Sequence, residues 1–73
     1  MGHRILIVDD DILITDYLKI ELEECCFELE VICENEGYLA LNRIMTGGID
    51  LLLTDIAMPD MDGYELYSRA KEY

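Results

Sequence analysis

Three aspartates follow directly after apolar segments that have the composition of buried strands. Asp9 and Asp10 come after the run RILIV (Arg4–Val8). Asp55 comes after the run IDLLLT (Ile49–Thr54). Continuous runs of this kind are typical of strands covered on both faces of a parallel sheet, whose carboxyl ends share one ligand-binding edge. If the first and third strands are neighbours, Asp9, Asp10 and Asp55 therefore converge.

Three converging carboxylates predict a cation site. Their negative charges repel one another, and a hard divalent cation relieves that repulsion. Mg²⁺ suits such a site because it binds through one or two carboxylates and keeps several of its water molecules. A carboxylate can also act as a nucleophile that accepts a phosphoryl group as an acyl phosphate, and Asp55 is the candidate for that role.

The alternative is that these acids only cap helices. Asp11 stands just before a helical pattern and is a good N-cap for it. One cap is sufficient for one helix, and Asp55 stands several residues ahead of the next helical pattern. Capping therefore explains Asp11 better than it explains Asp9, Asp10 and Asp55 together.

Three helical patterns alternate with three strand patterns along the chain. The second strand pattern is Phe27–Cys33, the second helical pattern begins after Gly37 and stops at Gly47-Gly48, and the third is Gly63–Lys71. The residues expected on the inward faces of the helices are Ile14, Leu18, Leu22 and Cys25 in the first, Leu41, Ile44 and Met45 in the second, and Leu66, Tyr67 and Ala70 in the third. This alternation implies an α/β domain with a parallel sheet and right-handed crossovers.

The charge balance restricts the partners of the chain. The 73 residues include 17 acids and 5 basic residues, for a formal net charge of -12. Such a balance argues against nucleic acid and anionic membrane surfaces as partners, because both need a basic footprint. No segment reaches the length of a membrane span, and the start of the chain lacks the apolar core of a signal peptide. We therefore expect a cytoplasmic protein.

The remaining reactive residue types do not form a catalytic pattern. Cys25, Cys26 and Cys33 lack the spacing of metal ligands, and we expect them to be reduced thiols that pack in the interior. The single histidine, His3, provides no triad, and the sequence contains neither GxGxxG after a strand nor GxxxxGK[ST]. The chain is therefore not expected to be an enzyme in the ordinary sense.

Several of these segments together resemble a known family. They are RILIVDDD, the later Gly37-x-x-Ala40-Leu41, and IDLLLTDIAMPDMDGYEL, which ends at Leu66. Their order and spacing resemble the receiver domain of two-component response regulators. The resemblance extends over essentially the whole chain, so residues 1–73 are interpreted as one partial, amino-terminal receiver domain.

The resemblance implies a fold and a chemistry. Receivers are flavodoxin-like, with five parallel strands in the order 2-1-3-4-5, so this chain is expected to form the 2-1-3 part with three helices and without strands four and five. In the family, a histidine kinase or phosphotransfer protein donates a phosphoryl group to the aspartate after the third strand, here Asp55. Mg²⁺ is held by the acids after the first strand, here Asp9 and Asp10, by Asp55, and by a backbone carbonyl, here that of Ala57.

The chain also departs from the family pattern. The family's Ser or Thr at the end of strand four and its Lys at the end of strand five have no counterpart in the 73 residues, so we expect little or no phosphorylation of this chain alone. A bare third strand predicts a homo-oligomer formed through an exposed apolar edge. Two alternatives therefore stay open beside the phosphoacceptor: a non-switching interaction module that dimerises in this way, and a Mg²⁺ enzyme that uses an aspartyl phosphate, for which the residues give less support.

Overall fold

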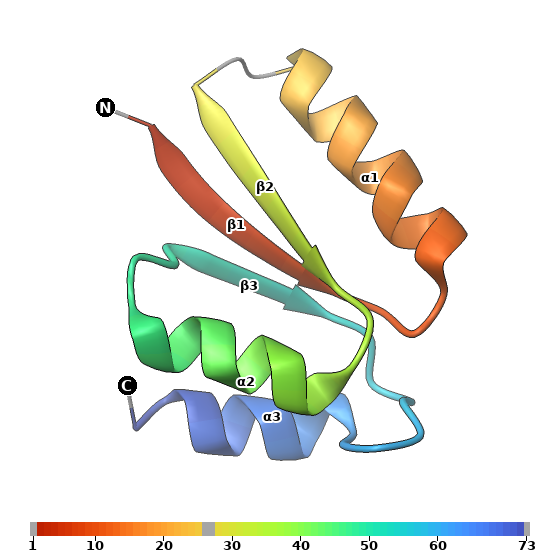
Figure 1. The fold of residues 1–73 in the computed structure, drawn as a ribbon, viewed down its shortest axis with the longest axis vertical. Coiled ribbons are helices and arrows are strands. Elements are labelled where there is room, and N and C mark those ends of the chain that lie inside the picture. The colour runs from red at the N-terminus through yellow and green to blue at the C-terminus, as the bar shows by residue number, and fades with distance from the viewer. Residues whose placement is uncertain (1, 26–27, 73) are drawn as a thin grey trace.

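The computed structural model describes residues 2–25 and 28–72 and contains alternating strands and helices. The elements are β1 (His3–Val8), α1 (Ile12–Cys25), β2 (Leu29–Glu34), α2 (Gly37–Thr46), β3 (Leu51–Thr54) and α3 (Gly63–Ala70). The strands form one sheet in the order β2-β1-β3, and both strand pairs are parallel (Figure 1). The predicted α/β architecture, with strand order 2-1-3 and three helices, is confirmed.

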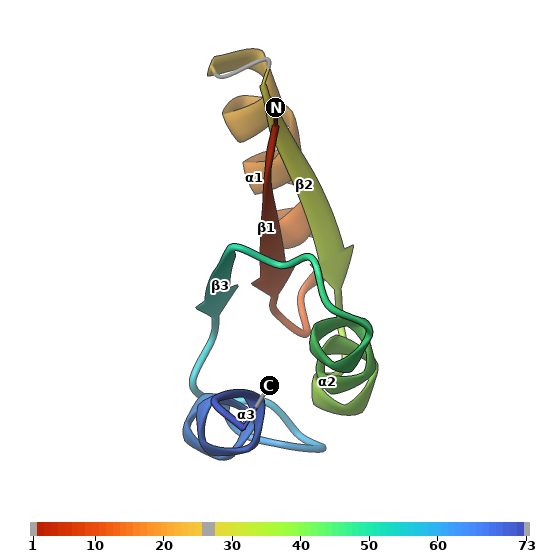
Figure 2. The same cartoon turned by 90° about the vertical axis from the view of Figure 1, so that its left-hand side faces the viewer.

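The helices cover the two faces of the sheet unequally. α1 lies on one face and packs mainly against β2, whereas α2 and α3 pack together on the opposite side (Figures 1 and 2). The carboxyl ends of all three strands point to the same end of the molecule, where the loops to the helices begin (Figure 1). This arrangement places the acidic residues that follow β1 and β3 at one common edge.

The main core lies between the sheet and the α2–α3 pair. The cluster of buried residues consists of Leu6 and Val8 from β1, Ala40 from α2, Leu66 from α3, and Met58 and Met61 from the loop before α3. Because successive strand residues face opposite sides, Ile7 and Val31 are buried on the other face, beneath α1. The two methionines show that the loop after β3 is itself part of the core.

The face through which the first helix packs overlaps the predicted face but is shifted toward Thr15. Leu18 and Leu22 are half-buried as expected, but Ile14 and Cys25 are exposed, and the fully buried residue is Thr15. The reason is that α1 covers β2 and little of β1, so its apolar residues outnumber the sheet positions available to them. Of the cysteines predicted to be buried, Cys33 is half-buried and Cys25 is exposed, while Cys26 lies outside the described residues.

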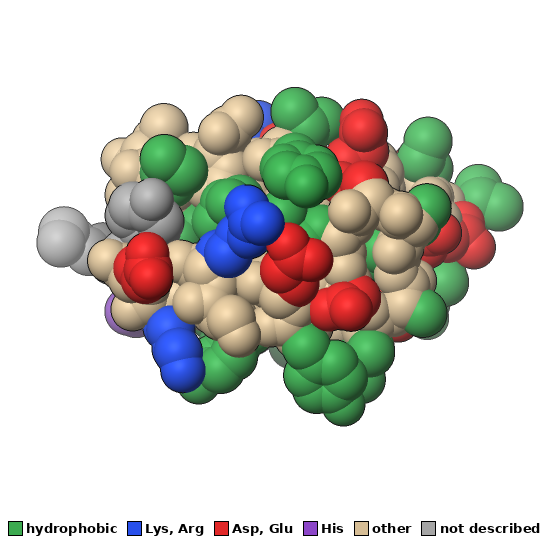
Figure 3. Space-filling model, turned by 90° about the horizontal axis from the view of Figure 1, so that it is seen from below, with side chains coloured by type: hydrophobic (Ala, Val, Ile, Leu, Met, Phe, Trp, Pro, Cys, Tyr) green, Lys and Arg blue, Asp and Glu red, His purple; other side chains and the backbone are tan. Residues whose placement is uncertain are grey.

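Smaller differences concern the other helices and the strand ends. Leu41, Ile44, Leu66 and Ala70 point inward as predicted, but Met45 and Tyr67 are exposed, because each follows an inward residue and lies about 100° further around the helix. Exposed apolar side chains are visible on the α3 side of the molecule (Figure 3). β3 begins at Leu51 rather than Ile49, and β2 runs to Glu34; the predicted start of β2 at Phe27 lies outside the described residues.

Candidate functional site

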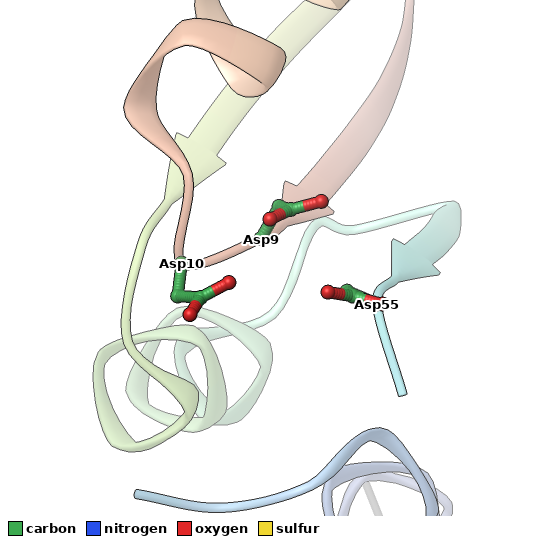
Figure 4. A group of neighbouring side chains, drawn as sticks. All are labelled: Asp9, Asp10 and Asp55. Carbon is green, nitrogen blue, oxygen red and sulfur yellow. The ribbon is translucent and has the colours of Figure 1, made fainter. Parts of the chain in front are cut away.

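The three predicted carboxylates lie close together. Asp9 and Asp10 follow β1, Asp55 follows β3, and one carboxylate oxygen from each lies within 4.8 Å of the other two. Figure 4 shows the three side chains facing a common space between the ends of the two strands. Asp9 is half-buried, while Asp10 and Asp55 are exposed, so the space between them is open to solvent.

Backbone pairing between β1 and β3 holds Asp55 beside the other two acids. The N–H of Asp55 donates to the carbonyl of Val8 at 2.9 Å, which continues the parallel ladder by one residue beyond β3. The Asp55 Oδ1 atom accepts from the N–H of Ile56 at 2.8 Å. On the other strand, Asp9 Oδ1 accepts from the N–H of Asp11 at 3.0 Å. In both Asp9 and Asp55, Oδ1 accepts a backbone hydrogen bond from the following loop, and Oδ2 accepts none from it.

The charge of the cluster is not balanced by basic side chains. In the described part of the chain, the Lys and Arg ion pairs are Arg4–Glu30, Lys19–Glu23, Arg43–Glu34 and Arg69–Glu65. None of these pairs involves Asp9, Asp10 or Asp55. Three carboxylates that face one another without such a partner repel one another, and a bound cation would relieve that repulsion.

The donor set is one that Mg²⁺ can bind. Mg²⁺ prefers oxygen ligands at about 2.1 Å, so opposite ligands of one ion are about 4 Å apart. One oxygen from each carboxylate lies within 4.8 Å of the other two, a spacing that one divalent cation can bridge. The exposure of Asp10 and Asp55 leaves room for the water molecules that Mg²⁺ retains.

The loop that follows Asp55 is closed by a glycine that no other residue can replace without displacement. The N–H of Gly63 donates to the carbonyl of Ile56 at 2.8 Å. A Cβ atom at Gly63 would lie 2.5 Å from the carbonyl oxygen of Asp55, closer than real Cβ contacts allow. Ala57 lies exposed in this loop, two residues after Asp55. The predicted role of its carbonyl stays a prediction.

Two further acids of this loop, whose roles the sequence did not predict, are helix caps. Asp62 Oδ1 accepts from the N–H of Glu65 at 2.8 Å and caps α3. Asp60 Oδ2 accepts from the N–H of Tyr38 at 3.1 Å and thereby caps α2, whose own N-cap residue, Glu36, forms no side-chain cap bond. The first cap could have been predicted, because Asp is a preferred N-cap residue and Asp62 directly precedes the helical pattern. The second cap depends on a contact between residues 22 positions apart.

Asp11 has the capping role that the sequence predicted. Its Oδ1 accepts from the N–H of Leu13 at 3.0 Å, at the start of α1. Asp11 is therefore used by its helix, whereas Asp9 and Asp10 are free to face Asp55. Within residues 2–25 and 28–72, no helix is both long and apolar enough to cross a membrane.

Comparison with known proteins agrees with this geometry. The family model of the response regulator receiver domain matches residues 5–73. The two-component response regulator ARR11 of Arabidopsis thaliana is 36% identical over 66 residues, which cover 90% of this chain and 13% of ARR11. The transcriptional regulatory protein CrdR of Helicobacter pylori is 34% identical over 71 residues, which cover 97% of this chain and 32% of CrdR.

Solved structures show the same fold. The chemotaxis protein CheY4 of Vibrio cholerae superimposes with a TM-score of 0.91 at 26% identity, over 99% of this chain and 58% of CheY4. A chain in the crystal structure of histidine kinase ThkA in complex with response regulator protein TrrA has a TM-score of 0.87 at 36% identity, over 96% of this chain and 59% of that one. The chain thus spans a third or less of these curated relatives and just over half of the solved chains. By sequence and by fold, it belongs to the response regulator receiver domain family.

Proposed function

We propose that this chain is the phosphoacceptor part of a two-component response regulator, in which Asp55 accepts a phosphoryl group in a Mg²⁺-dependent reaction. The observation that carries the proposal is the cluster of Asp9, Asp10 and Asp55, whose oxygens lie within 4.8 Å of one another. Membership of the receiver family supports the same assignment.

Asp9, Asp10 and Asp55, together with the carbonyl of Ala57, would hold the metal. When bound, Mg²⁺ would offset two of the three negative charges of the carboxylates and shield the negative oxygens of an incoming phosphoryl group. The chain's own contribution is to keep the carboxylates in place through the β1–β3 pairing and the closed loop after Asp55.

In the proposed reaction, a carboxylate oxygen of Asp55 attacks the phosphorus atom of a phosphohistidine. A P–O bond forms, the P–N bond to the donor imidazole breaks, and its electron pair stays on the imidazole nitrogen. The product is an aspartyl phosphate. Asp55 is exposed at the edge of the sheet, so a protein donor can reach it.

The proposed partner is a sensor histidine kinase or a phosphotransfer protein. The solved complex of ThkA with TrrA, to which this chain is similar, supports a kinase partner. The net charge of -12 argues against nucleic acid or an anionic membrane as a ligand of this chain itself. A cytoplasmic location follows from the same proposal, because a kinase of this pathway transfers its phosphoryl group inside the cell.

A Mg²⁺ titration of the 73-residue chain, followed by the amide NMR signals of residues 9–11 and 55–57, tests the metal site. We expect saturable shifts in the wild type and binding weakened at least about tenfold in Asp9→Asn or Asp55→Asn, because each removes a charged ligand. Asp16→Asn, which removes one negative charge from an exposed position on α1, is the matched control and should bind as the wild type does. Equal loss in all three variants would contradict a specific site.

Phosphorylation is tested in a hybrid chain, because the 73 residues lack the family's Lys and Ser or Thr. Residues 1–73 are joined to the remaining part of CheY4, and the hybrid is incubated with Mg²⁺ and acetyl phosphate. Intact-mass measurement should show one added phosphoryl group that disappears in Asp55→Asn, whereas the chain alone should show little or none. A folded hybrid that takes up no phosphoryl group, or one that is still modified after Asp55→Asn, would refute the proposed function.

The second candidate is a module that associates with a second copy of itself, which does not require phosphorylation. The observation that favours it is the exposed edge strand β3, where Leu51 and Leu53 are 56% and 48% exposed. Exposed apolar strands at a sheet edge favour pairing between chains. The two candidates are compatible, because the exposed leucines lie on β3, whereas the acidic cluster lies beyond the carboxyl ends of β1 and β3.

A further inference from the structure

The amide of Asn35 connects three segments that meet at the acidic end of the sheet. Asn35 lies just after β2, and its Nδ2 atom donates to the carbonyl of Asp9 at 2.8 Å and to Oγ1 of Thr15 at 3.1 Å. Thr15 is only 1% exposed, and its Oγ1 in turn donates to the carbonyl of Ile12 at 3.1 Å. The end of β2, the loop after β1 and the first turn of α1 are thus joined through one amide group.

This contact fixes the peptide bond between two of the proposed metal ligands. The carbonyl of Asp9 belongs to the same planar unit as the N–H and Cα of Asp10. Holding that carbonyl therefore restricts the direction in which the Asp10 side chain leaves the backbone. On the preceding side, the N–H of Asp9 donates to the carbonyl of Glu34 at 3.3 Å, so Asp9 is held on both sides by the end of β2.

The chemistry of the contact requires a donor at position 35. A carbonyl oxygen can only accept, so the nitrogen end of the amide must face Asp9, and the NH₂ group has a second hydrogen for Thr15. An apolar side chain at this half-buried position would leave the Asp9 carbonyl without this donor. The loss would reach the metal site through the backbone, since Asn35 itself is not one of the clustered carboxylates.

We propose that Asn35 is a positioning residue for the metal site, which holds the Asp9–Asp10 peptide so that both carboxylates face Asp55. The proposal rests on the proposed function, because it assumes that the cluster binds Mg²⁺. Removing a group that is hydrogen-bonded to a metal ligand typically weakens metal binding by about 10- to 100-fold. Because Asn35 acts on a backbone carbonyl rather than on a ligand oxygen, we expect the lower end of that range, about tenfold.

The test is the Mg²⁺ affinity of the 73-residue chain, measured from amide NMR shifts in Asn35→Ala and Asn35→Leu. Asn35→Leu retains the side-chain volume, so it stays informative if the alanine variant folds poorly. Asn42→Ala is the matched control, since it makes the same change at an exposed position of α2. Thr15→Val is a second control, because it removes the other acceptor of the amide and leaves the bond to Asp9.

We expect both Asn35 variants to bind Mg²⁺ about tenfold more weakly, while Asn42→Ala binds as the wild type does. Thr15→Val should lower the melting temperature without a comparable loss of Mg²⁺ affinity, which separates positioning from general stability. Unchanged affinity in the Asn35 variants, or equal losses in Thr15→Val, would overturn the inference and leave the proposed function standing. Absence of Mg²⁺ binding in the wild type would overturn both.

Discussion

At the scale of single residues, the acids around Asp55 form two groups with different structural roles. Asp9, Asp10 and Asp55 face one another, whereas Asp60 and Asp62 bind the backbone N–H groups at the starts of α2 and α3. The loop between β3 and α3 is therefore attached to two helices. Ala57, whose carbonyl is the remaining proposed ligand, lies in this loop.

The cap formed by Asp60 predicts a loss of stability in acid. Desolvation raises the pKa of the Asp60 carboxyl, but the backbone N–H groups of Gly37, Tyr38, Asp60 and Met61 together outweigh it, and the net pKa is lowered. A pKa that is lower in the folded state means that the stabilisation is present above the unfolded pKa, and is lost as the pH falls through the folded pKa. The expected window lies below about pH 4, where an ordinary Asp becomes protonated.

Urea unfolding at a series of pH values measures this effect. Asp60→Asn retains an oxygen that can accept from the N–H of Tyr38, but its side chain cannot be protonated in this range. The free energy of unfolding of this variant should therefore fall less than that of the wild type between pH 5 and pH 3, and the difference should correspond to the titration of one carboxyl group. Asp16→Asn removes an exposed acid on α1 and should keep the slope of the wild type. Identical slopes for Asp60→Asn and the wild type would show that the cap does not contribute.

At the scale of elements, local sequence patterns predicted most of the architecture. The apolar runs before Asp9 and Asp55, the cap at Asp11 and the Gly47-Gly48 stop correspond to features of the structure. Gly47 and Gly48 both have φ of 86°, a conformation that favours glycine. These signals are local, because each depends on neighbouring residues or on a short period.

The features that the sequence did not reveal depend on contacts between distant segments. Asn35 reaches Asp9 across 26 positions, and Asp60 reaches Tyr38 across 22. Helical periodicity predicts Tyr67 and Met45 on inward faces, but both are exposed, because periodicity does not say how wide a face the neighbouring elements cover. The convergence of the carboxylates could be predicted because it needs only the strand order, whereas the groups that support them need the tertiary fold.

The two edge strands of the sheet differ in how their outer hydrogen-bonding groups are satisfied. In β2, the carbonyl of Val31 accepts from Lys19 Nζ at 2.6 Å, and its N–H donates to Glu23 Oε2 at 3.1 Å. Lys19 and Glu23 also pair with each other at 3.3 Å. Two side chains of α1, Lys19 and Glu23, thus occupy the outward N–H and carbonyl of Val31, which an added strand would use. We call these two side chains the β2 clamp. Charged groups of this kind protect an edge from strand addition.

Removal of the β2 clamp is expected to open this edge. The double substitution Lys19→Met and Glu23→Met keeps most of the apolar length of the side chains but leaves Val31 without its two partners. Buried or half-buried groups that lose their partners cost about 1–3 kcal/mol, so the variant should be less stable and should associate more at equal concentration. Denaturant unfolding and light scattering would measure the two effects.

The matched control is Arg69→Met with Glu65→Met, which removes another exposed i,i+4 ion pair, on α3, without changing the net charge. If this control associates as much as the clamp variant, added surface apolarity rather than edge opening is responsible.

The clamp should also weaken in acid. The hydrogen bond from the Val31 N–H is the main cause that lowers the pKa of Glu23; desolvation raises this pKa, and the interactions with Lys19 lower it further, so the net pKa lies below its ordinary value. Its contribution is therefore present near neutral pH and lost as the pH falls through that lowered pKa.

At the scale of the whole molecule, the uncovered apolar surface is concentrated where the helices do not reach. α1 lies over β2, so the face of β3 on that side has no helix above it (Figure 2). Leu51 and Leu53 pair with Ile5 and Ile7 and therefore lie on this face. With the β2 edge occupied by the clamp, β3 is the edge at which a second copy could pair.

The predicted self-association is tested by size-exclusion chromatography with light scattering over a range of concentrations. We expect the wild type to shift toward a dimer as concentration rises, and Leu51→Thr with Leu53→Thr to shift toward the monomer, because Thr keeps the strand preference but lowers apolar area. Removing about 1 kcal/mol or more of transfer free energy per side chain predicts a dimer dissociation constant raised at least about tenfold. Tyr64→Ser changes a still more exposed apolar residue, on α3, and should leave the dimer intact. A folded wild type that stays monomeric at every concentration would refute association through β3, because the exposed leucines would then be tolerated without a partner.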